Sequence, residues 1–208
     1  MRQFIHLAGL ALVAAAAASC GDVVREGSSP VFLVIDTLAA VRGGASSTTA
    51  TSNLLSDVIT NATQPAPCSS AAPCPTVFDD SGTVVLRAPL KDIGGSNALT
   101  PTSNNEVTIT RFTVEYVRAD GRNTPGVDVP YPIDGSVTGT IPAGGTLSLG
   151  FEIVRHTAKQ ESPLVELKTS PNIIVTTAKV TFYGVDRVGN NVSVTGQIQI
   201  NFGNFGDI

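Results

Sequence analysis

Residues 192–202 read VSVTGQIQINF, the clearest pattern in the sequence. Apolar residues and the small Gly196 recur at every second position, while serine, threonine, glutamine and asparagine fill the positions between them. Successive side chains of a β-strand point to opposite faces of the sheet, so this alternation predicts a strand with one buried face and one hydrated face.

The same two-residue period recurs along most of the chain after Pro30. It predicts further strands at 31–37, 84–90, 106–118, 136–141, 147–153 and 173–185, with a short edge strand at 54–59. Within 106–118 the apolar parity changes after Ile109. That change predicts a β-bulge near Thr110 and Arg111, or a strand that switches between two sheets.

Turn-forming sequences rich in Asp, Asn and Gly separate these segments. They predict turns at 79–82, 120–121, 134–135, 144–145 and 186–190. One helical turn is expected at 162–168, where Ser162 could cap it and Pro163 could occupy its first position. The compositionally biased segments 42–53 and 91–105 are expected to be loops. This spacing of strands and turns predicts an all-β fold, an antiparallel β-sandwich of at least seven strands.

The run from Val180 to Val192 reads VTFYGVDRVGNNV. It resembles the last hairpin of immunoglobulin-like and fibronectin-III-like modules found on bacterial surfaces. The resemblance implies an immunoglobulin-like sandwich, and because it rests on a widespread turn motif it implies no activity.

The N-terminus has the layout of an export signal, with Arg2 followed by an apolar stretch from Leu7 to Ala18. The sequence AASCG at 17–21 resembles the lipobox of bacterial lipoproteins. That resemblance implies cleavage between Ser19 and Cys20 and lipidation of Cys20. The alternative is an ordinary signal peptide cleaved nearby, with Cys20 not modified. Under the lipoprotein interpretation a lipid tethers the domain to a membrane of the bacterial cell envelope, facing the periplasm or the exterior.

Cysteine parity favours the lipoprotein interpretation, because the chain has three cysteines. An odd thiol in a secreted protein invites intermolecular pairing, whereas a lipidated Cys20 leaves Cys68 and Cys74 as a pair. Three prolines keep the segment around these two cysteines out of regular structure, so a local disulfide is expected. No further cysteine or nearby histidine completes a structural zinc site.

Three segments follow from these features: a signal peptide at 1–19, a flexible lipidated stalk at 20–30 and one β-sandwich domain at 31–208. Without residues 1–19 the chain carries 12 basic and 17 acidic residues, a net charge of −5. The basic residues are scattered along the sequence, which argues against a nucleic-acid partner.

Candidate chemistry in the mature chain is sparse, and we predict no cofactor. His156 is the one histidine left after residue 19, and we interpret it as a surface residue. Loop-end oxygen ligands make calcium conceivable, but aspartate before glycine is also what a turn requires, and we favour the turn. The weak calcium candidates are Asp79, Asp80, Asp186 and Asn190.

Residues 123–132 read NTPGVDVPYP, a proline-stiffened segment that carries Asp128 and Tyr131. It is a candidate partner loop, and an edge connection protected by prolines is the competing interpretation. We therefore expect a non-enzymatic, lipid-anchored module that binds an envelope or extracellular protein. The alternatives are a hydrolase or calcium-dependent enzyme with a site built from dispersed loop residues, and a structural subunit of a surface assembly.

Overall fold

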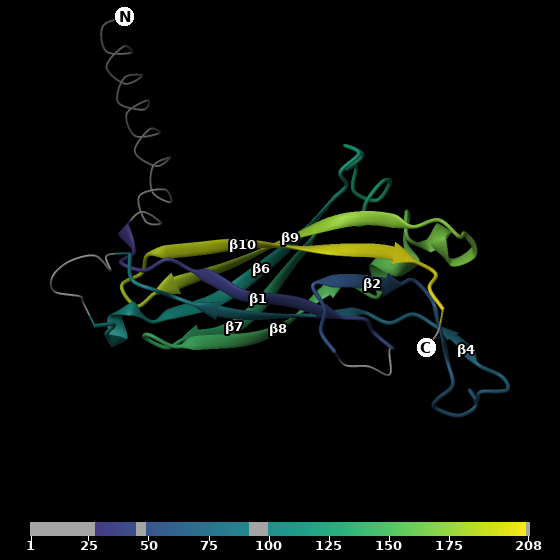
Figure 1. Ribbon diagram of the computed structural model, residues 1–208, viewed down its shortest axis with the longest axis horizontal. Helices are drawn as coiled ribbons and strands as arrows, with labels where there is room; N and C mark the ends of the chain where they lie inside the picture. The colour runs from purple at the N-terminus through teal and green to yellow at the C-terminus, as the bar shows by residue number, and fades with distance from the viewer. Residues whose placement is uncertain (1–27, 45–48, 92–99, 207–208) are drawn as a thin grey trace, which may run out of the picture.

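The computed structural model describes residues 28–44, 49–91 and 100–206 (Figure 1). The strands in these ranges are β1 (Val34–Val41), β2 (Asn53–Asp57), β3 (Thr60–Ala62), β4 (Cys74–Thr76), β5 (Asp80–Arg87), β6 (Val107–Val117), β7 (Ile133–Ile141), β8 (Thr146–Val154), β9 (Ile174–Asp186) and β10 (Asn191–Gly203). Three short 3₁₀ helices accompany them: η1 (Ser103–Asn105), η2 (Thr157–Gln160) and η3 (Val165–Thr169). Within these ranges, no helix has the length and apolarity to cross a bilayer.

Two sheets make the sandwich. One has the strand order β1-β5-β8, and the other has the order β2-β10-β9-β6-β7. Neighbouring strands are antiparallel except for β2, which runs parallel to β10 at the edge of the larger sheet. A separate hairpin, β3–β4, projects beside the sandwich (Figure 1). The predicted all-β, antiparallel β-sandwich is therefore confirmed.

The side chains of β10 alternate between the core and the outer face, as the sequence predicts. Val192, Ile198, Ile200 and Phe202 are buried, while Gln197 and the other polar residues of the same strand lie on the outer face. The strand pairs with β9 over almost its whole length, so the two long strands form the backbone of the larger sheet.

Aromatic side chains from both sheets fill the centre of the core. The ring of Phe151, from β8, lies 5.2 Å from that of Phe112 and 5.3 Å from that of Phe182, centroid to centroid. Tyr116 stacks edge-on against Phe202, and its buried hydroxyl donates a hydrogen bond of 2.6 Å to the carbonyl oxygen of residue 153. Burial raises the pKa of Tyr116 well above its ordinary value. The buried residues of the two sheets form one continuous cluster.

The predicted bulge lies where the apolar parity of β6 changes. The pairing of β6 with both neighbours shifts register between Ile109 and Arg111. Because the extra residue reverses the alternation, Ile109 and Phe112 both reach the core, where each is at most 4% exposed.

Two predicted turns are wrong because glycines serve packing there. Residues 80–82 begin β5, and residues 134–135 lie inside β7. A Cβ on Gly82 would lie 2.4 Å from the ring of Phe151, and one on Gly135 would lie 2.4 Å from the ring of Phe112. Each glycine thus leaves room for an aromatic ring to lie on the strand.

The predicted helical turn is also displaced. The 3₁₀ helix η3 begins at Val165, after Leu164, so Ser162 does not cap it and Pro163 is not its first residue. Turns at 120–121, 144–145 and 186–190 are confirmed, and their glycines Gly121, Gly144 and Gly189 have positive φ.

The sandwich has two ends, where the connections between its long strands lie. We call one the entry end, which carries the first described residues, 28–33, and the turn 186–190. Burial of Asp186 opposes its ionisation, but hydrogen bonds from Asn190, Ser29 and Val188 outweigh this and lower its pKa. We call the opposite end the loop end: it carries the connections 118–132 and 155–173 and the β3–β4 hairpin. Figure 1 shows the first described residues, in purple, and β4 at opposite ends of the long axis.

Candidate functional site

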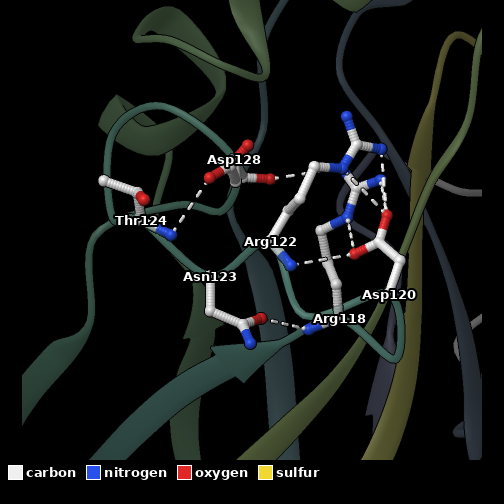
Figure 2. A network of polar contacts seen from close by, with 6 residues as sticks. All are labelled: Arg118, Asp120, Arg122, Asn123, Thr124 and Asp128. Carbon is white, nitrogen blue, oxygen red and sulfur yellow. Dashed lines mark hydrogen bonds and ion pairs between the residues drawn. The ribbon is translucent and has the colours of Figure 1, made fainter.

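The connection 118–132, between β6 and β7, is braced by a network of charges (Figure 2). The carboxylate of Asp120 accepts hydrogen bonds from the guanidinium groups of Arg118 and Arg122, at 2.7 Å and 2.9 Å between Nη2 and Oδ2. These two arginines hold the pKa of Asp120 well below its usual range. At the start of the loop, the charge of Asp120 is therefore paired with the charges of two arginines.

The remainder of the loop is closed on itself. The carboxylate of Asp128 accepts from the backbone N–H of Thr124 at 3.2 Å, and the Asp128 N–H donates to the Thr124 carbonyl at 2.8 Å. The side chain of Asn123 accepts from the N–H of Arg118 at 2.7 Å. Asp128 thus orders the loop that the sequence singles out (Figure 2).

Two large apolar side chains of the connection 118–132 are exposed to solvent. Tyr131 is 51% exposed, and Val127 is 65% exposed. The tyrosine ring lies directly over Gly126, whose φ is +76° and where a Cβ would come within 2.4 Å of the phenol oxygen. The position of Tyr131 therefore depends on a glycine in a left-handed conformation.

The connection 155–173 meets this loop across an open pocket of ≈ 450 Å³. Arg118, Arg122 and Asp128 line it on one side, and Glu166 lines it on the other. Ile173, which is 54% exposed, also borders the pocket. We call the surface formed by Val127, Tyr131, Ile173 and these charged groups the loop-end surface.

The structure describes the predicted disulfide but not the predicted cleavage and lipidation site. Ser19 and Cys20 lie outside the described residues. Cys68 and Cys74 form the predicted disulfide, with their Cα atoms 5.4 Å apart, and Cys74 is the first residue of β4. The bridge thereby closes the connection within the β3–β4 hairpin.

The calcium candidates are not brought together. Asp79 is exposed and Asp80 is buried at the loop end, whereas Asp186 and Asn190 lie at the entry end. Oδ1 of Asp186 accepts from the N–H groups of Val188 and Asn190, so this carboxylate organises a turn. Among the described residues, no three or more His, Cys, Asp or Glu side chains gather as a metal site.

His156 lies on the surface, as predicted, and its imidazole faces the side chain of Gln160 at 3.3 Å. None of the carboxylates in the pocket between 118–132 and 155–173 approaches it by a hydrogen bond in this structure.

A buried polar cluster that the sequence pattern does not reveal lies beneath the loop end. Lys159 of η2 and Asp80 of β5 are fully buried, and Nζ lies 2.9 Å from Oδ1. Ser56 of β2 donates to Oδ2 at 2.5 Å, and the N–H of Gly43 donates to Oδ1 at 2.8 Å. Asp80 looks like a turn residue and Lys159 sits in a polar run, so no local pattern marks either as buried.

Comparisons with known proteins do not assign a function to this surface. No protein family and no curated protein matches the chain. One solved structure that resembles it is titled "X-ray structure of Northeast Structural Genomics Consortium target SoR45", with 10% identity and a TM-score of 0.35. The similarity covers 86% of this chain and 90% of that one, and it is too weak to indicate a shared function.

Proposed function

We propose that this protein is a lipid-anchored module of the bacterial cell envelope that binds a protein partner through its loop-end surface and catalyses no reaction. The observation that carries the proposal is the loop-end surface itself. Exposed apolar side chains stand there on a loop whose charges are already paired.

The energetics of that surface suit protein recognition. Tyrosine supplies a large contact area at little cost in conformational entropy, and hot spots are rich in Tyr and Arg. Because Arg118, Asp120 and Asp128 already hold the loop together, binding would order few additional groups. Fixed positive and negative groups around the pocket would select a partner of complementary charge.

The placement of the two ends supports the same proposal. The described chain starts at the entry end, and β9 has 13 residues, which corresponds to roughly 40 Å of extended strand. A tether through Cys20 would join the domain at the entry end and leave the loop-end surface facing away from the membrane. Two or three acyl chains on that residue would hold the domain durably.

The strand order further supports an immunoglobulin-like topology within the sandwich. In that assignment β1, β5 and β8 are strands A, B and E, and β10, β9, β6 and β7 are strands G, F, C and C′. Such sandwiches commonly present loops at their ends as binding surfaces.

The anchor is tested by metabolic labelling with palmitate. We expect label in the wild-type protein, recovery in the membrane fraction, and loss of both in the Cys20→Ser variant. Equal distribution of the two proteins between soluble and membrane fractions would reject the anchor.

Partner binding is tested by replacing Val127 with a photo-crosslinking amino acid in cells. Val188 is the matched control, because it is a valine of similar exposure, 63% against 65%, at the entry end. We expect a discrete protein adduct from position 127 that is lost when Tyr131→Ala is added. Adducts of equal yield from both positions, or none from position 127, would exclude the loop-end surface as the contact.

A further inference from the structure

The buried cluster of Asp80, Lys159 and Ser56 brings an amine and a carboxyl group into hydrogen-bond contact. Both side chains have no exposed surface, and 2.9 Å separates Nζ of Lys159 from Oδ1 of Asp80. They come from positions 79 residues apart in the chain. The fold therefore holds two complementary functional groups together in a place that water does not reach.

Burying an ion pair in a site without water costs free energy. Removing two charges from water is costly, and their mutual attraction in a buried site repays this cost only in part. Burial raises the pKa of Asp80, although the charge of Lys159 and the hydrogen bonds from Ser56 and Gly43 act in the opposite direction. Transfer of a proton from ammonium to carboxylate would give a neutral amine beside a neutral acid.

The hydrogen-bond count at Nζ points the same way. A lysine ammonium has three N–H donors. Within the part of the chain that the structure describes, the acceptor that Nζ contacts is Oδ1 of Asp80. An amide nitrogen carries a single hydrogen, so amide formation lowers the number of buried N–H donors at this nitrogen from three to one and removes both charges.

We propose that Lys159 and Asp80 become joined, after folding, by an isopeptide bond between Nζ and Cγ. The amine lone pair attacks Cγ, the C–N bond forms, and one C–O bond breaks. The leaving oxygen departs as water, taking one hydrogen from the carboxylic acid and one from the nitrogen. The condensation needs no oxidant, reductant or cofactor.

The surroundings of the carboxyl group favour this step. The hydroxyl of Ser56 and the N–H of Gly43 donate to its two oxygens, where negative charge develops as the amine attacks. Fixing both reactants in one pocket also replaces a bimolecular encounter with an intramolecular one.

The bond would fasten the connection 155–173 to the start of β5. It would thereby stiffen one side of the pocket at the loop-end surface, but the inference does not depend on partner binding or on the lipid anchor.

Peptide mapping of the purified, folded full chain tests the proposal after the disulfide is reduced and the protein is denatured. Trypsin cleaves after Lys and Arg, so an unreacted chain yields separate peptides 43–87, 156–159 and 160–168. We expect instead peptide 43–87 joined to peptide 156–168, one water lighter than their sum, with no cleavage after Lys159. Cleavage after Lys168 in the same digest serves as the internal control.

Two variants complete the experiment. Lys159→Arg and Asp80→Ala should each lose the joined peptide, whereas Lys179→Arg, on the outer face of β9, should keep it. Separate peptides of full mass from the folded wild-type chain would overturn the proposal, whether or not the variants fold. A water loss confined to the Asp120-Gly121 or Asp134-Gly135 peptides would also overturn it, because cyclised aspartate explains such a loss.

Discussion

Single residues set the shape of the loop-end surface, and Gly126 is the one with the sharpest consequence. Its positive φ and the Tyr131 ring above it leave no place for a side chain. Gly121, in the same connection, also has a positive φ, +81°, but no atom lies within 4 Å of the place that a Cβ would occupy. A substitution at Gly121 therefore tests backbone strain alone, whereas a substitution at Gly126 adds a steric clash.

We expect Gly121→Ala to lower the free energy of unfolding by about 1 kcal/mol through backbone strain alone. Gly126→Ala should lose about 1–2 kcal/mol more, because it also displaces the ring. Urea denaturation of both variants measures the difference. Equal losses would mean that Tyr131 does not rest on Gly126.

Asp186 makes stability at the entry end depend on pH. Its folded-state pKa is lowered, so as pH falls the unfolded chain takes up a proton first. The stabilisation is therefore present above the unfolded-state value, about 3.9, and is lost as pH falls through the folded-state value.

The prediction for Asp186→Asn follows from that linkage. At pH 7 the variant should be less stable than the wild type by about 1–2 kcal/mol, the usual cost of weakening buried hydrogen bonds. The difference should shrink below pH 4, as chemical denaturation at several pH values would reveal. Asp134→Asn is the control, because that carboxylate is 64% exposed. A pH-independent difference for Asp186→Asn would contradict the assignment.

At the scale of elements, glycines in strands leave room for the aromatic ring of the neighbouring strand. Gly82→Ala should cost about 1–3 kcal/mol, because the new methyl group would collide with the ring of Phe151. Gly150→Ala is the matched control in the neighbouring strand, where the nearest atom to a Cβ lies 4.0 Å away. Thermal unfolding of both variants measures the contrast. A similar change in melting temperature for both would show that the ring does not require Gly82.

The disulfide belongs to an element that stands apart from the sandwich. Closing so short a ring stabilises by about 2 kcal/mol in the chain-entropy model. Because β3 and β4 pair with each other, the Cys68→Ala/Cys74→Ala double variant should be cut faster by protease within 63–73. The unfolding midpoint of the sandwich should move little. A large drop in that midpoint would mean that the hairpin supports the core.

Alternation explains why the strands could be predicted and the glycine positions could not. The period of β10 and the parity change in β6 are local patterns that directly report which side chains face inward. Gly82 and Gly135 look like turn residues, since the rings that need their space are distant in sequence.

The sequence likewise predicts one part of the candidate site and not the buried cluster beneath it. Its proline-stiffened loop, with Asp128 and Tyr131, stands out in the sequence. The pairing of Asp80 with Lys159 spans 79 residues and carries no periodic signal, so it required the fold to bring the two together.

At the scale of the whole molecule, one core joins the two sheets. Phe182 is fully buried in β9 and contacts aromatic rings from both sheets. We expect Phe182→Ala to lower the free energy of unfolding by about 3–5 kcal/mol. Far-ultraviolet and near-ultraviolet circular dichroism should follow one shared transition in the wild-type and variant proteins. Two separated transitions would indicate that the sheets unfold independently.

The opposite placement of the entry end and the loop end has a mechanical consequence. A partner held at one end and an anchor at the other would stretch the protein along its strands. Hydrogen bonds between β1 and β5 lie across that direction, so they would share the load in shear and break together, not one after another as in an unzipping hairpin. A domain tethered in this way would resist being pulled open by flow or by the movement of neighbouring cells.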